Sequence, residues 1–124
     1  MSEELLFLII THLVSDWLFQ PAKWAVKKIK IFKYRFLHSL QYILLFIPVL
    51  YFLDISLFWL IWIFATHLFI DSYKFVNFWN NKIRSRGLET PRWIIIVQDQ
   101  ILHLVVLIPV VLIPVVLKIP LGII

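Results

Sequence analysis

Residues 55–73 read ISLFWLIWIFATHLFIDSY, an apolar stretch interrupted by one histidine and one aspartate. A transmembrane helix needs about 20 mostly apolar residues, and this stretch comes close to that length. His67 and Asp71 stand four positions apart, so a helix places both on one face. Ionisable side chains inside a membrane helix are costly and usually mark a functional site. The stretch therefore predicts a membrane-spanning helix that carries polar chemistry.

Two further apolar segments carry the same pair of residues at the same spacing. They contain His12 with Asp16, and Asp99 with His103 in reverse order. If the helix with the reversed pair runs antiparallel to the other two, all three pairs share one orientation. At a rise of 1.5 Å per residue, the histidines then lie about 6 Å deeper than the aspartates. We therefore expect the three pairs to meet in one cluster.

The composition is that of an integral membrane protein. Hydrophobic residues make up 62% of the 124 residues, charged residues 15%, and the mean hydropathy is +0.93. Soluble domains carry roughly a quarter charged residues. We expect one transmembrane helical domain over residues 1–124. The absence of cysteine excludes disulfides, thiolate metal sites and cysteine nucleophiles from this sequence.

Four apolar runs define the expected fold. They cover residues 5–19, 36–53, 55–73 and 93–117. A turn at Asp54 should join the second and third runs as a tight helical hairpin. Pro109 and Pro114 should kink or break the fourth run, which neighbouring helices tolerate in a bilayer. The sequence predicts an all-α integral membrane bundle of four transmembrane helices.

The net charge of +5 does not indicate a nucleic-acid partner, because eleven of the twelve Lys and Arg residues fall in two short blocks that flank apolar runs. The first block is expected to be an interfacial amphipathic segment and contains Lys23, Lys27, Lys28, Lys30, Lys33 and Arg35. The second contains Lys74, Lys82, Arg84, Arg86 and Arg92. The positive-inside rule places both blocks in the cytoplasm and both termini outside.

A cluster of carboxylates in low dielectric is repulsive, and divalent cations relieve that repulsion. Imidazole and carboxylate together suit Zn²⁺, Mn²⁺ or Fe²⁺. The candidate metal ligands are His12, Asp16, His67, Asp71, Asp99 and His103, and the three aspartates are also the candidate catalytic residues. Six ligands exceed what one tetrahedral zinc needs, so the set would also accommodate a dinuclear site. Open positions on such a site would activate water near neutral pH.

Four more residues could support the ligands or contact a substrate: Gln20, His38, Lys74 and Gln100. Gln20 follows Asp16 by four positions. Lys74 follows Asp71 by three, which on a continuous helix places it near that carboxylate; the alternative is that it reaches to the membrane interface. His38 begins the second run, where a ligand, a supporting donor and an interfacial residue are all open interpretations.

Three functions stay open at this point. The first is metal-dependent hydrolysis of a lipid or lipid-linked phosphate at the cytoplasmic leaflet. The second is transport of a proton or metal ion, but the outer halves of the runs, such as residues 44–53 and 105–117, are nearly all apolar. The third is a non-enzymatic membrane subunit or effector that binds a protein partner. Membrane lipid is the expected partner in the first, and a homo-oligomer or membrane partner is open in all three.

The motifs THLVSDWLFQPAKW (residues 11–24), THLFIDSYK (66–74) and DQILH (99–103), with His38, follow the ordered pattern H-x3-D-x3-Q, His, H-x3-D-x2-K and D-Q-x2-H. In this the chain resembles, over about residues 5–108, a family of small bacterial integral membrane proteins catalogued as domain of unknown function 3307. The resemblance implies a compact helical protein of the bacterial inner membrane with a polar centre. The pairs also resemble those of membrane-bound metal-dependent hydrolases, by analogy alone.

Overall fold

The computed structural model describes residues 2–84 and 88–117, the last three by their backbone alone. These residues form helices, and no strand occurs among them, which confirms the all-α prediction for the described part of the chain. The elements are α1 (Glu3–Leu13), the π-helical segment η1 (Val14–Leu18), α2 (Ala22–Lys27), α3 (Phe32–Phe52), α4 (Trp59–Ile70), α5 (Tyr73–Phe78), the π-helical segment η2 (Trp79–Arg84), α6 (Arg92–Val105) and α7 (Ile108–Leu117). Arg86 of the second basic block and residues 118–124 lie outside the described residues.

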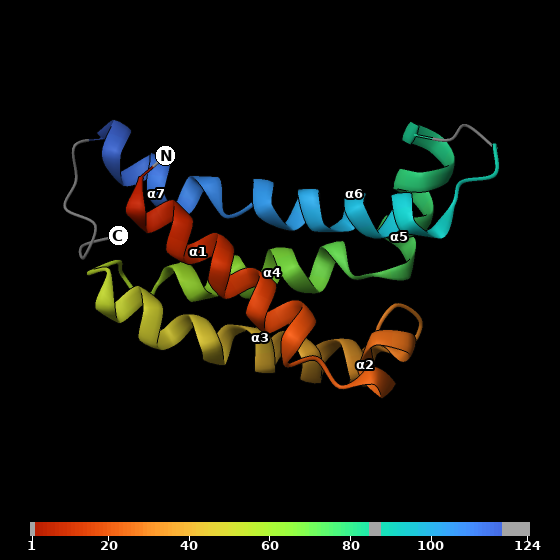
Figure 1. Ribbon diagram of the computed structural model, residues 1–124, viewed down its shortest axis with the longest axis horizontal. Helices are drawn as coiled ribbons and strands as arrows, with labels where there is room; N and C mark the ends of the chain where they lie inside the picture. The colour runs from red at the N-terminus through yellow and green to blue at the C-terminus, as the bar shows by residue number, and fades with distance from the viewer. Residues whose placement is uncertain (1, 85–87, 118–124) are drawn as a thin grey trace.

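The long helices lie side by side, with α1 and α4 running in one direction and α3 and α6 in the other (Figure 1). Helix α6, which carries the reversed Asp99/His103 pair, is therefore antiparallel to α1 and α4, which carry His12 and His67, as predicted. Helices α2 and α5 lie at one end of the bundle, whereas the start of α1, the α3–α4 turn and α7 lie at the other (Figure 1). Both basic connections thus share one end of the molecule.

Local sequence explains where several helices begin and turn. The Ser2 hydroxyl accepts a hydrogen bond from the Leu5 amide at 3.3 Å and caps α1, whose first turn contains Glu3 and Glu4. Asp54 adopts a positive φ of 54° in the turn between α3 and α4. Aspartate is one of the few residues besides glycine that tolerates this conformation, so the predicted hairpin forms at low cost.

The fourth apolar run is broken, as its prolines predicted. Helix α6 ends at Val105, and α7 begins at Ile108, so Pro109 occupies the first turn of α7, where a missing amide hydrogen costs no hydrogen bond. At the break, Trp62 Nε1 donates to the Val106 carbonyl at 2.8 Å. That bond ties α4 to the junction of α6 and α7.

The four-span prediction is supported for two segments. Among the described residues, Phe32–Phe52 (21 residues) and Arg92–Pro114 (23 residues) are long and apolar enough to cross a membrane, whereas Trp59–Ile70 is a shorter apolar helix of 12 residues. The third run is shorter than expected because α4 starts only at Trp59 and ends before Asp71, which caps it. Helix α3 starts four residues earlier than the run and includes part of the first basic block.

The apolar core occupies the end of the bundle near the α3–α4 turn. It is built from Leu8 of α1, Phe46 and Leu50 of α3, Ile63 of α4 and Val110 of α7, all at most 1% exposed. The buried polar residues lie further along the same helices, toward the end of the bundle that contains α2 and α5. The bundle is therefore divided into an apolar half and a polar half.

The apolar half predicts the effect of a core truncation. Phe46→Ala should lower the free energy of unfolding by about 3 kcal/mol or more, because it leaves a cavity between α1, α3 and α4. Reversible unfolding in detergent measures this loss. Phe58→Ala is the matched control, since Phe58 is 68% exposed; equal losses in the two variants would contradict the described core.

Candidate metal centre

Two irregular helix ends position Asp16 and Asp71. Beyond His12, the chain widens into the π-helical segment η1, where the Phe19 amide donates to the Val14 carbonyl at 3.0 Å. Within η1, the adjacent residues Ser15 and Asp16 are both buried. Asp71 caps the C-terminus of α4, and Ser72 then caps α5. Single-turn π-helical segments occur often at functional sites, because they re-aim side chains.

The four histidines of the chain meet between these helix ends. Ring centroids are 5.4 Å apart for His12 and His103, 4.8 Å for His38 and His67, and 4.6 Å for His67 and His103. All four side chains are buried, at most 1% exposed. The predicted convergence of the three pairs is thus confirmed for their histidines, and His38 joins them as a full member.

Lys28 lies inside the cluster, which the sequence analysis did not foresee. Its Nζ is 2.9 Å from Asp71 Oδ2 and 3.4 Å from Asp16 Oδ1. Burial alone would lower the pKa of Lys28, but Asp71 and Asp16 outweigh it, so that the pKa is raised above its ordinary value and the ammonium stays charged. Lys27 and Lys30 beside it are exposed, and the composition of the block gave no signal that separates the three.

A chain of hydrogen bonds holds Asp16. Because an amide nitrogen only donates, Gln100 Nε2 donates to Asp16 Oδ2 at 2.7 Å, which leaves Gln100 Oε1 to accept from His12 Nε2 at 2.9 Å. His12 Nδ1 then accepts from the Tyr42 hydroxyl at 2.8 Å. Both nitrogens of His12 are engaged in this chain. Tyr42 was also missed, although its position four residues after His38 puts it on the same helix face.

His67 and His103 differ from His12, because they direct unpaired nitrogens into the cluster. His103 Nδ1 donates to the backbone carbonyl of Asp99 at 2.7 Å. In a neutral ring, the Nε2 of His103 then carries the lone pair. That Nε2 and both nitrogens of His67 are buried without a hydrogen-bond partner among the described residues. A buried polar atom without a partner costs about 1–3 kcal/mol. Such atoms need an explanation.

One ligand atom from each of His67, Asp71 and His103 lies within 4.8 Å of the other two. His67 Nε2 is 3.3 Å from Asp71 Oδ2, and His103 Nε2 is 3.8 Å from Asp71 Oδ1. Two imidazoles and a carboxylate are a suitable donor set for Zn²⁺, Mn²⁺ or Fe²⁺. We name these three residues the open triad. They fit a divalent cation, and a cation would satisfy the lone pairs that the protein leaves unpaired.

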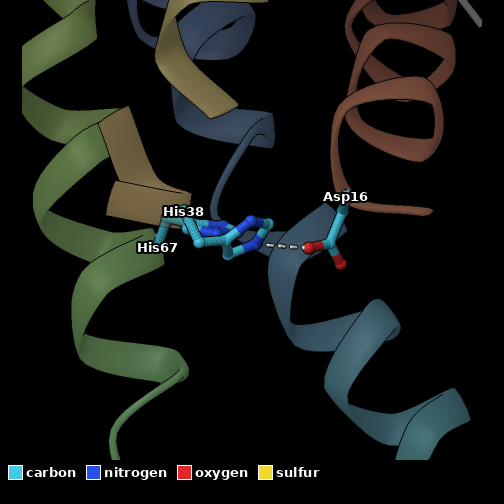
Figure 2. A group of neighbouring side chains, drawn as sticks. All are labelled: Asp16, His38 and His67. Atoms are coloured by element: carbon cyan, nitrogen blue, oxygen red, sulfur yellow. Dashed lines mark hydrogen bonds and ion pairs between the residues drawn. The ribbon is translucent and has the colours of Figure 1, made fainter. Parts of the chain in front are cut away.

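A second group of three, Asp16, His38 and His67, also lies within 4.8 Å (Figure 2). Here Asp16 Oδ1 and His38 Nε2 already have partners, and His67 is shared with the open triad. His38 Nε2 is 2.8 Å from Asp16 Oδ1, as the dashed line in Figure 2 shows, and Gln20 Nε2 and Lys28 Nζ approach it at 2.9 and 3.3 Å. The open triad is therefore the better metal site of the two.

A cavity of about 300 Å³ lies beside the cluster, and we call it the site pocket. Its charged lining residues are Asp16, Lys28, Asp71, Arg92 and Asp99. Trp17, Phe75 and Trp79 contribute to its apolar walls. The Asp99 side chain is 26% exposed, so its carboxylate stands at the edge of the cluster rather than within it.

The structure thus sorts the predicted site residues. It brings together His12, Asp16, Gln20, His38, His67, Asp71, Gln100 and His103, and it puts Asp99 at the edge. Lys74 is exposed and stays outside. Because α4 ends at Ile70 and α5 restarts at Tyr73, Asp71 and Lys74 do not share a continuous helix face, and that part of the expectation is wrong.

Residues 5–121 match the model of a family described as "Protein of unknown function (DUF3307)". No curated protein and no solved structure matches the chain. The family match extends further toward the C-terminus than the motifs do, and it includes every residue of the cluster. The chain belongs to the DUF3307 family of proteins of unknown function.

Proposed function

We propose that the chain is a membrane-embedded, metal-dependent hydrolase that acts on a lipid or lipid-linked phosphate. The observation that carries this proposal is the open triad, in which two buried imidazoles direct unpaired nitrogens toward the Asp71 carboxylate. Unpaired buried lone pairs beside a carboxylate and a pocket are more typical of a metal site than of a structural polar core.

The surface supports an insertion into lipid. Large apolar side chains are widely exposed on the bundle, among them Leu18 at 74%, Phe52 at 75% and Ile61 at 64%. In each of the two candidate spans only 28% of the window is buried, whereas the core helix of a soluble protein is mostly buried. Soluble monomers rarely expose large apolar patches. With the basic connections at one end, the positive-inside rule favours a cytoplasmic position for that end in a bacterial inner membrane.

Charge balance favours one metal ion rather than two. With neutral imidazoles, Asp16, Asp71 and Asp99 contribute three negative charges, and Lys28 contributes one positive charge. One divalent cation neutralises the remaining two, and with Arg92 at the pocket the total becomes one positive charge, which a second cation would raise to three. Lys28 therefore replaces the second ion that six ligands alone would suggest, and its ammonium lies within 2.9 Å of one proposed ligand.

The residues around the pocket have distinct roles in the proposed reaction. His67, Asp71 and His103 would hold the ion, which supplies a Lewis acid and activates water at neutral pH. Asp99, whose carboxylate stands at the edge of the cluster, would take a proton from the attacking water. Arg92 lines the pocket and offers positive charge to a phosphate, while the aromatic walls suit an apolar group.

The apolar half of the bundle favours an enzyme over a transporter. A transported ion needs polar groups along its whole path. Beyond the histidines, most buried side chains of the described residues are apolar, including Leu8, Phe46 and Val110. The hydroxyls of Thr11 and Tyr42 lie next to the histidines and are already hydrogen-bonded within the protein. The cluster is thus closed toward the α3–α4 turn, which suits a site that is reached from one side.

Removing a triad residue should abolish metal retention. Asp71→Asn and His103→Gln should each reduce the zinc, manganese or iron content of purified protein at least tenfold, since each removes one of three ligands. Elemental analysis of protein purified without added metal measures this content.

Asp54→Asn is the matched control, because it removes a carboxylate at the opposite end and asparagine tolerates the positive φ there. Unchanged metal content in both triad variants would overturn the metal centre. A folded wild-type protein that takes up no metal would redirect the search to a protein partner.

A bound metal ion should compensate for the loss of the Lys28 ammonium. Lys28→Met leaves Asp16 and Asp71 without their cation, so the metal-free variant should lose about 3 kcal/mol of stability. Added Mn²⁺ should then raise its midpoint of thermal unfolding by more than it raises that of the wild type.

Lys27→Met is the control, since the neighbouring Lys27 is exposed. If metal stabilises the two variants equally, Lys28 does not share the charge balance of the site.

Asp99 should be needed for turnover but not for metal binding. Asp99→Asn should lower the release of phosphate from dodecyl phosphate in mixed micelles by a factor of about 10²–10⁴, the usual contribution of a general base. Its metal content should stay within twofold of the wild type. Equal rates of phosphate release would exclude Asp99 as the base.

A further inference from the structure

A second hollow lies on the face between α4 and α6, and we call it the apolar groove. It has a volume of about 380 Å³. Trp62, Ala65 and Phe69 of α4 line one side, and Val105 and Val106 line the other. Thr66 also lines the groove, but its hydroxyl donates to the Trp62 carbonyl at 2.8 Å. The groove therefore offers an apolar surface and no obvious polar ligand-binding group.

The apolar groove adjoins the site pocket. Ile70, Phe75 and Leu102 line both hollows. Ile70 directly precedes Asp71, and Leu102 directly precedes His103, so the shared wall stands beside two residues of the open triad. The two hollows thus lie next to each other at the open triad, on the two sides of these shared residues.

The groove has a defined far end. From Ile70 back to Trp62, α4 extends for about 12 Å at 1.5 Å per residue. There the Trp62 indole donates to the Val106 carbonyl and bridges α4 and the start of the α6–α7 junction. The groove thus has one end at the polar cluster and the other at a fixed indole, a shape that suits an extended hydrocarbon chain.

We propose that the apolar groove holds the hydrocarbon chain of the same molecule whose polar head lies in the site pocket. The substrate class is then an amphiphile with a phosphate head and at least one chain that reaches Trp62. The identity of the head rests on the proposed function, whereas the position of the chain rests on the residues that line both hollows. Ala65 provides the space, since a larger side chain at this position would fill the groove.

The charge of the pocket predicts how the head is selected. Its five charged residues sum to one negative charge, and a bound divalent ion changes this sum to one positive charge. The metal-loaded protein should therefore prefer a phosphate head, and the metal-free protein an ammonium head. Both heads place the same chain in the groove, which allows the chain to be tested without the metal.

The test uses dodecyl phosphate with a bromine at the chain end, which quenches a nearby indole. In zinc-loaded protein in phosphatidylcholine vesicles, the probe should quench Trp62 with saturation at a few mole per cent. Trp62→Phe should remove the saturable part, as should Ala65→Phe. Ile61→Phe should keep it, since Ile61 lies on α4 outside the groove lining and is 64% exposed.

A shorter probe provides a second readout, in case Ala65→Phe does not fold. Brominated butyl phosphate should leave unquenched the part of the emission that Trp62→Phe removes, because its chain is too short to reach Trp62. Any quenching of Trp17 and Trp79 in the site pocket should persist in the Trp62→Phe variant. Quenching that rises linearly with mole fraction and is equal in the Ala65→Phe and Ile61→Phe variants would show bulk lipid only and overturn the proposal.

Brominated dodecylamine separates this inference from the proposed function. Saturable quenching by the amine in metal-free protein, without quenching by the phosphate in the presence of zinc, would retain the groove and reject the metal-dependent phosphate site. Absence of saturable quenching with both probes would reject the groove.

Discussion

The ammonium of Lys28 between the carboxylates of Asp16 and Asp71 is the interaction on which the polar half of the bundle depends. It connects the residue after α2 to the π-helical segment η1 and to the end of α4. Two buried carboxylates without a cation would repel each other and force these segments apart. A buried ion pair contributes little net stability, because desolvation offsets attraction, but the loss of one partner is costly. Lys28 therefore specifies how the segments meet more than it stabilises them.

The division of the bundle into two halves follows from the same constraint. Buried charge needs partners. The helices therefore bring their buried polar residues together at one height in the bundle, where Lys28, the histidines and Gln100 contact the carboxylates. The rest of each helix is free to pack as an apolar core, with Phe46 and Leu50 of α3 against Leu8 of α1. The result is a site that is closed on one side by hydrocarbon and open on the other through the site pocket.

Regular helical spacing predicted much of this arrangement, and departures from it account for what was missed. The order of the apolar runs and the basic blocks predicted the antiparallel α6, and with that direction the i,i+4 pairs and the reversed order of Asp99 and His103 predicted a single cluster. The spacing argument assumes an uninterrupted helix, so it placed Lys74 on the face of Asp71, where the chain in fact ends one helix and begins another. Lys28 follows the end of α2, outside any periodic pattern, and only the tertiary fold brings it inside.

These interruptions occur where the proposed chemistry needs them. A regular helix satisfies its own backbone and exposes side chains in fixed directions, whereas a helix end or a π-helical turn can aim a carboxylate across the bundle. Asp16 lies in such a turn, and Asp71 caps α4. The break after Val105 frees the Val106 carbonyl, which accepts a hydrogen bond from the Trp62 indole. The same irregular backbone therefore positions the polar cluster at one end of the α4–α6 face and marks the far end of the apolar groove at the other. A site pocket and a groove that share one wall are the expected outcome when two neighbouring helices are interrupted at different levels.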